Sequence, residues 1–159
     1  MPVRTRASVR RDHGYLLPRH GREGPILRFD QCGDLQGYLK RREGARLAHL
    51  ASLVPAGQVI VELGSFKGKS TCFLALGSKA GAGVKVHCFD LWDMGGHPPG
   101  GWVTNCDDPQ TLELFRFQLA AMKCKSMVVE HQGETADGGR EWAGAPVGLL
   151  FIDGDHSEE

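Results

Sequence analysis

The sequence predicts an α/β fold with a doubly wound parallel sheet, and three observations lead to this prediction. Short runs of β-branched and apolar residues alternate with stretches of helical periodicity along the chain. Four such runs are strand candidates: 58–63, 84–90, 126–131 and 147–153. A polar or glycine-rich segment follows each run at its carboxyl end. Because strands that alternate with helices pair in parallel, we expect these segments to meet in one ligand-binding crevice.

Length and composition fit one soluble domain. The chain has 159 residues, of which 41% are hydrophobic and 24% are charged, and this length is typical of a single domain. Nineteen basic and nineteen acidic side chains cancel, so the chain lacks the cationic excess of a nucleic-acid or membrane-surface protein. No apolar run approaches the roughly 20 residues that cross a bilayer. The first residues, MPVRTRASVRRDHG, contain no apolar core that could act as a secretory signal, so we expect a cytoplasmic location.

Basic residues are concentrated ahead of the predicted core. Residues 1–46 hold eleven basic and five acidic side chains, whereas residues 47–159 hold eight and fourteen. Residues 1–28 show no sustained hydrophobic period, so we expect a flexible basic arm there and a folded domain over 29–159. The arginines of the arm do not identify a partner.

Two helices and two strands are predicted in the first half of the domain. Apolar residues at three- to four-residue steps predict a helix over 44–54, which ends at Pro55-Ala56-Gly57. The run 58–63 predicts a strand buried on both faces, and a helix over 70–79 follows its glycine-rich turn. The run 84–90 predicts a second strand, which ends in an aspartate.

The second half repeats the pattern. Asp108 supplies an N-cap and Pro109 a first-turn residue for a helix over 109–124. The apolar stripe of this helix consists of Leu112, Phe115, Leu119 and Met122. A strand over 126–131, a short helix near 138–143 and a strand over 147–153 complete the prediction.

Several residue types carry no predicted chemistry. The five cysteines are odd in number and form no C-x-x-C pair, which indicates reduced, buried thiols. The tryptophans Trp102 and Trp142, like the phenylalanines of helix 109–124, are expected to pack. No chemistry is predicted for three histidines that lack a partner at metal-ligand spacing: His87, His97 and His131.

The turn after the first strand reads ELGSFKGKST, residues 62–71, and it fits neither common phosphate-binding motif. A P-loop requires four residues between its glycines, whereas Gly64 and Gly68 enclose three. The dinucleotide motif G-x-G-x-x-G fails because Phe66 stands where the second glycine would approach a pyrophosphate. Glu62 also disfavours an anion, and it can accept a hydrogen bond from an ammonium group or order the loop. A zwitterionic, sulfonium-bearing nucleoside suits this environment better.

Two motifs resemble a known enzyme family. The arrangement E-x-G-x-F-x-G-x-S/T at 62–70 resembles motif I of class I S-adenosylmethionine-dependent methyltransferases, in the branch of small-molecule O-methyltransferases. The stretch LLFIDGDHS at 149–157 resembles the F-I/V-D-G-D-H-S segment of the same branch. The resemblance implies a Rossmann-like sheet, of which this chain would hold the N-terminal four strands.

The resemblance also implies residue roles. The glycine loop would pass beneath the cofactor, Asp90 would hold its ribose hydroxyls, and Leu91 and Trp92 would contact its adenosine. The implied cofactor-binding residues are Glu62, Gly64, Ser65, Phe66, Gly68, Ser70, Thr71, Asp90, Leu91, Trp92, Glu134, Thr135 and Asp153.

The predicted chemistry is methyl transfer to an oxygen of a small molecule, such as a sugar or natural product. Asp153 would face the methyl group of S-adenosylmethionine and could serve as a ligand of Mg²⁺. His156 is of the residue type that acts as a general base near neutral pH. We therefore name Asp153 and His156 as the candidate catalytic residues, and Asp155 is expected to stabilise the turn between them.

The sequence ends at Glu159, before the remaining strands of a seven-stranded methyltransferase sheet. A fragment of a longer protein, a homo-oligomer that pairs through the exposed sheet edge, and a poorly folding chain all stay open. Two other functions also stay open. One is a catalytically inactive module that binds cofactor or a partner. The other is a nucleotide-phosphate enzyme that uses Lys67 or Lys69.

Overall fold

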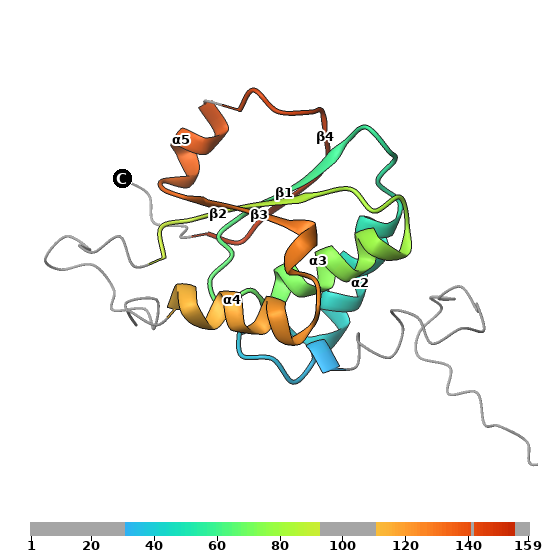
Figure 1. Cartoon of the computed structure of the whole chain (residues 1–159), viewed down its shortest axis with the longest axis vertical. Coiled ribbons are helices and arrows are strands. Elements are labelled where there is room, and N and C mark those ends of the chain that lie inside the picture. The colour runs from blue at the N-terminus through green and yellow to red at the C-terminus, as the bar shows by residue number, and fades with distance from the viewer. Residues whose placement is uncertain (1–30, 93–110, 141, 155–159) are drawn as a thin grey trace, which may run out of the picture.

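The computed structural model describes residues 31–92, 111–140 and 142–154, and it shows a parallel sheet flanked by helices (Figure 1). The strands are β1 (Val59–Leu63), β2 (Val86–Asp90), β3 (Val128–Gln132) and β4 (Val147–Ile152). Their order across the sheet is β3-β2-β1-β4, and every neighbouring pair is parallel. This arrangement confirms the predicted fold class.

The helices lie on both sides of the sheet. They are α2 (Arg41–Ser52), α3 (Lys69–Ala80), α4 (Thr111–Ala121) and α5 (Thr135–Arg140), and a 3₁₀ helix, η1, spans Lys125–Met127. In Figure 1, α2, α3 and α4 cover one face of the sheet, and α5 lies on the other side. The connections from β1 to β3 through α3 and α4 therefore run on one face, and the connection from β3 to β4 through α5 runs on the other, as in a doubly wound fold.

Side chains of one strand alternate between two apolar cores. Ile60 of β1 packs in the main core, together with Phe73 and Leu74 of α3 and Phe115 of α4. Val61 packs in a smaller core on the opposite face, formed by Val59, Val61 and Phe89 with Leu63 and Trp142 against them. Burial on both faces explains why β1 reads as a continuous apolar run.

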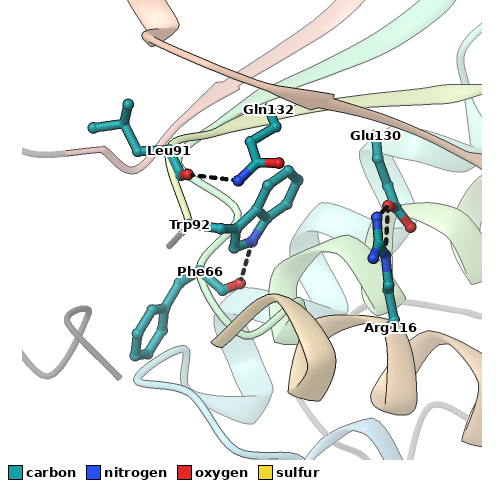
Figure 2. Close-up of polar contacts among 6 residues, drawn as sticks. All are labelled: Phe66, Leu91, Trp92, Arg116, Glu130 and Gln132. Atoms are coloured by element: carbon teal, nitrogen blue, oxygen red, sulfur yellow. Dashed lines mark hydrogen bonds and ion pairs between the residues drawn. The ribbon is translucent and has the colours of Figure 1, made fainter. Parts of the chain in front are cut away.

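Two contacts fix the helices that carry the site. A β-carbon at Gly77 of α3 would collide with the backbone of Ala48 in α2, so only glycine permits this close helix approach. Arg116 of α4 forms an ion pair with Glu130 of β3 through Nη2–Oε2, at 2.7 Å (Figure 2). These contacts hold α3 against α2, and α4 against the sheet.

Most predicted boundaries agree with the structure within three residues, and two differences have clear causes. Residues 125–127 form η1, so the third strand begins at Val128 rather than at residue 126. The short helix lies at 135–140 rather than near 138–143, and in this glycine-rich stretch apolar periodicity gives little guidance.

Among the described residues, the aromatic side chains that we predicted to pack do so with one exception. Phe115 is buried, and the Trp142 ring lies edge-on to His87 with its centroid 4.9 Å away. Phe117 is 69% exposed, so the prediction that it packs is wrong. Two residues advance a helix by about 200°, and Phe117 therefore faces away from Phe115. The described cysteines are buried and free, as predicted: Cys32, Cys72, Cys88 and Cys124.

Several predictions fall outside the described residues: the arm over 1–28, the N-cap at Asp108-Pro109, and Trp102. The division into an arm and a domain stays a prediction. In the part of the chain that the structure describes, no helix is long and apolar enough to span a membrane. The strands β3 and β4 form the two edges of the sheet, and Leu150 and Ile152 of β4 are more than half exposed. Oligomerisation through this edge stays a prediction.

Candidate cofactor-binding site

The carboxyl ends of all four strands meet at one edge of the sheet. The Gly64 N–H, after β1, donates to the Phe89 carbonyl of β2 at 2.9 Å. The Asp153 N–H, after β4, donates to the Leu63 carbonyl at 2.9 Å, and the Gly133 N–H, after β3, donates to the Asp90 carbonyl at 3.0 Å. Backbone hydrogen bonds therefore bring together the segments that the sequence singled out.

The loop between β1 and α3 requires glycine at both of its predicted glycine positions. Gly64 has φ +85°, and a β-carbon there would lie 2.6 Å from the Asp153 carbonyl oxygen and from Gly154. Gly68 also has φ +85°, and its β-carbon would lie 2.7 Å from the Phe115 ring. Glycine adopts this conformation without steric cost. The loop thereby passes close to the β4 end without an intervening side chain.

Glu62 is buried beneath this loop and orders it. Its Oε2 accepts hydrogen bonds from Ser65 Oγ at 2.8 Å, from Thr71 Oγ1, and from Cys88 Sγ at 3.3 Å. Burial raises the pKa of the Glu62 carboxyl above its ordinary value, and the hydrogen bonds from Thr71 and Ser65 oppose that rise. The other oxygen, Oε1, is buried without a hydrogen-bond partner in the described structure. Of the two predicted roles of Glu62, loop ordering is the one that these contacts display.

Asp90 anchors the same loop from the end of β2. Its Oδ2 accepts the backbone N–H groups of Ser65 at 2.8 Å and of Phe66 at 2.7 Å. Its Oδ1 accepts the Trp92 N–H at 2.7 Å. A carboxylate offers about four lone-pair directions, so Asp90 keeps acceptor capacity on Oδ1. The ribose contact implied by the resemblance stays a prediction.

Trp92 braces the loop rather than projecting into solvent. Its Nε1 donates to the Phe66 carbonyl at 2.9 Å (Figure 2). Trp92 is 7% exposed, and its ring packs against that of Phe115. Phe66 and Trp92 have φ +46° and +42°, a conformation that non-glycine residues seldom adopt. Gln132 Nε2 donates to the Leu91 carbonyl at 3.3 Å, and the Leu91 side chain points away from Trp92 (Figure 2). The adenosine contacts of Leu91 and Trp92 stay predictions.

The remaining predicted residues lie around this edge. Ser70 and Thr71 are buried in the first turn of α3, Glu134 is exposed just before α5, and Thr135 is the first residue of α5. Asp153 is exposed directly after β4. The second candidate catalytic residue, His156, lies outside the described residues, as does Asp155.

The described residues do not supply a complete metal site. Across 31–92, 111–140 and 142–154, no group of three or more histidine, cysteine, aspartate or glutamate side chains is placed to hold a metal ion. The role of Asp153 as a Mg²⁺ ligand therefore stays a prediction.

Sequence reasoning missed two long-range contacts near the sheet. Gln118 of α4 bonds the loop at Lys67 and the backbone of Gln36, 82 positions away. His87 Nδ1 and His131 Nε2 lie 2.9 Å apart on the face of the smaller core. Neither pair has a local spacing signal in the sequence, because only the parallel pairing of strands and the position of α4 bring them together.

A family model that is described as a methyltransferase domain matches residues 61–159 of this chain. The chain belongs to the methyltransferase-domain family. The match covers all four strands except the first two residues of β1, and it includes the glycine loop and Asp153.

Solved structures show the same fold. Cofactor-bound Rv0187 from MTB is 25% identical to this chain, with a TM-score of 0.56. The match covers 82% of this chain and 51% of the Rv0187 chain. The Bacillus cereus O-methyltransferase, crystallised with SAH, is 20% identical, with TM-score 0.55 and coverage of 88% and 57%. TomG of Streptomyces achromogenes, an O-methyltransferase of tomaymycin synthesis in complex with SAM, is 21% identical, with TM-score 0.53 and coverage of 83% and 54%.

This methyltransferase-domain chain spans about half the length of these structures, which it covers by 51%, 57% and 54%. Its four-stranded parallel sheet with flanking helices has the Rossmann-like class I methyltransferase fold.

Proposed function

We propose that this chain binds S-adenosylmethionine and forms the cofactor-binding part of a methyltransferase that acts on an oxygen of a small molecule. One observation carries the proposal. Two carboxylates, Glu62 and Asp90, order a glycine loop at the carboxyl edge of the sheet in a chain of the methyltransferase-domain family. The solved structures with SAM or SAH bound support the choice of cofactor. Sugars and natural products are the proposed acceptor classes.

The loop fits a cofactor with a carboxylate at one end and a ribose at the other. The first N–H groups of α3 have no intrahelical partner, and Gly68 at the N-cap has no side chain to cap them. These amides would hold the methionine carboxylate. Asp90, on the neighbouring strand, would accept the ribose hydroxyls. Gly64 lets the loop lie directly against the end of β4, where a side chain would collide with Asp153 and Gly154.

A bound S-adenosylmethionine supplies an electrophilic methyl group. The protein must then align an acceptor oxygen in line with that group and remove its proton. We assign alignment to Asp153, and its fixed backbone supports this assignment: its N–H donates to the Leu63 carbonyl and its own carbonyl lies against Gly64. We assign proton removal to His156, whose ordinary pKa of about 6.5 suits a general base.

The same carboxylates argue against a nucleotide-phosphate enzyme. Glu62 and Asp90 both bond the loop that would have to cradle a phosphate. The lysines of the loop are also engaged: Lys69 Nζ lies 3.4 Å from the Gly37 carbonyl, and Lys67 Nζ lies 5.0 Å from the centroid of the Phe66 ring. We therefore expect no competition between ATP and the cofactor.

Equilibrium dialysis of the purified chain against labelled S-adenosylhomocysteine tests the proposal, with ATP and NAD as competitors. Saturable one-site binding that neither competitor displaces supports it. Binding of ATP at the same site, or no binding of S-adenosylhomocysteine by a chain shown to be folded, contradicts it. A second test adds labelled S-adenosylmethionine and an acceptor library, and it compares the chain with the Asp153→Asn variant.

A further inference from the structure

Gln118 joins three segments that are far apart in the sequence. It lies on α4 and is 4% exposed. Its Oε1 accepts the Gln36 N–H at 2.7 Å, and its Nε2 donates to the Gln36 carbonyl at 3.2 Å. The same Nε2 donates to the Lys67 carbonyl at 2.5 Å. One buried amide therefore satisfies both backbone groups of Gln36 and one carbonyl of the glycine loop.

The segment that Gln118 holds continues directly to an aromatic contact on the loop. Tyr38, two residues after Gln36, stacks on Phe66 with ring centroids 5.8 Å apart and planes inclined by 7°. Tyr38 is 76% exposed, so the stack lies at the surface beside the carboxyl edge of the sheet. Gly37 lies between Gln36 and Tyr38 in the sequence, and its carbonyl accepts a hydrogen bond from Lys69 Nζ at 3.4 Å.

Phe66 thus has its backbone and its ring fixed from different elements. Its N–H donates to Asp90, the last residue of β2. Its carbonyl accepts a hydrogen bond from Trp92 Nε1 (Figure 2). Its ring is fixed by Tyr38, whose segment depends on Gln118. A loop ordered in advance loses less conformational entropy on binding, and this raises affinity.

We propose that Gln118 is a positioning residue: it keeps residues 36–38 in place on the glycine loop, so that Tyr38 and Phe66 form the outer wall of the ligand site. This inference rests on the proposed function. It extends the site to a segment ahead of α2 and to a helix that the loop motif does not include. The wall is aromatic on the side where Lys67 Nζ lies over the Phe66 ring.

The test replaces Gln118 with methionine, which has a similar length and is a good helix former but neither donates nor accepts these hydrogen bonds. The matched control is Phe117→Ala, on the adjacent and exposed position of α4. We expect the dissociation constant for S-adenosylhomocysteine to rise about tenfold in Gln118→Met, since bonds to buried backbone groups are lost. The control should stay within about twofold of the parent chain, which is below the effect of one hydrogen bond.

A second readout needs no ligand. The nuclear Overhauser contact between the Tyr38 and Phe66 rings should vanish in Gln118→Met and persist in Phe117→Ala. In addition, Tyr38→Ala should weaken binding, and combining it with Gln118→Met should add little, because both act on the same wall. If Gln118 had a purely structural role, Gln118→Met would lower the thermal stability of the chain without changing the affinity of the folded chain for S-adenosylhomocysteine.

The outcomes separate the two proposals. If the parent chain does not bind S-adenosylhomocysteine, the proposed function falls, and the ring contact still decides whether Gln118 positions the segment. If Gln118→Met keeps the ring contact, or binds as tightly as the parent, the positioning role is overturned. Should Gln118→Met fail to fold, Gln118→Glu replaces it. Glutamate retains the acceptor for the Gln36 N–H but loses the donor to the Gln36 and Lys67 carbonyls, and the same losses of affinity and of the ring contact are expected.

Discussion

The carboxylate of Asp90 accepts the backbone N–H of Phe66 at 2.7 Å, across 24 positions of sequence. The same oxygen accepts the Ser65 N–H, so the end of β2 fixes the turn that follows β1. Asp90 therefore orders the glycine loop even without a bound ligand. Loss of the acid should affect loop order and ligand affinity together.

Asp90→Asn should reduce both stability and cofactor affinity. Asparagine has one acceptor oxygen, whereas Asp90 uses both of its oxygens for three N–H groups. We expect a loss of about 1–3 kcal/mol in the free energy of unfolding, measured by urea denaturation, and at least about tenfold weaker binding of S-adenosylhomocysteine. Asp34→Asn is the control, because the Asp34 side chain is 85% exposed. Equal effects of the two substitutions would refute the anchoring role.

Gly64→Ala should lower stability more than Gly57→Ala, although the two glycines have nearly the same φ angle. Gly64 has φ +85° and Gly57 has φ +87°, so both substitutions place a β-carbon at a positive φ, which L-residues seldom adopt. A β-carbon at Gly57 meets nothing within 4 Å, whereas at Gly64 it collides with Asp153 and Gly154. The difference should be about 1–3 kcal/mol in the free energy of unfolding. Equal losses would show that the close approach to the β4 end is absent.

Acid should destabilise the fold through the His87–His131 pair. Burial lowers the pKa of both imidazoles below their ordinary value, and His131 and Lys85 lower the pKa of His87 further. The folded chain therefore binds these protons less readily than the unfolded chain. Their contribution to stability is complete above about pH 6.5 and is lost as the pH falls through the lowered pKa values.

The double variant His87→Gln/His131→Gln isolates this effect. Burial raises the pKa of Glu62, whose contribution runs in the opposite sense, because the folded chain holds that proton more readily. Glu62 is common to both proteins, so the difference between their stability curves from pH 5 to pH 8 reports the histidines. We expect the parent chain to lose more stability toward pH 5 than the variant. Parallel curves would contradict the assignment.

The buried thiols should be unreactive in the folded chain. Burial raises the pKa of Cys32 to about 12, and it also raises the pKa of Cys88. Cys72 and Cys124 lie with their sulfur atoms 3.9 Å apart, and their hydrogen bond is the main cause of a raised pKa at Cys72. In a Cys106→Ser variant, a thiol reagent at pH 8 should label the native chain about a hundredfold or more slowly than the urea-unfolded chain. Fast native labelling would show that this core is open.

Local sequence patterns predicted the strands because β1 and β2 are buried and rich in apolar residues. The glycine loop was also predictable, since Gly64 and Gly68 hold conformations that other residues seldom adopt. The anchoring of that loop was not, because Gln118 and Trp92 reach it only through tertiary packing. The sequence likewise could not indicate that Trp92 would be buried with its ring against Phe115.

A two-dimensional NMR titration of the ¹⁵N-labelled chain with S-adenosylhomocysteine tests whether the cofactor binds at the glycine loop. We expect saturable shifts that are largest at the amides of Gly64, Ser65, Gly68 and Asp90 and small at the exposed face of β4. Shifts confined to other elements, or none at concentrations that saturate known methyltransferase sites, would contradict it.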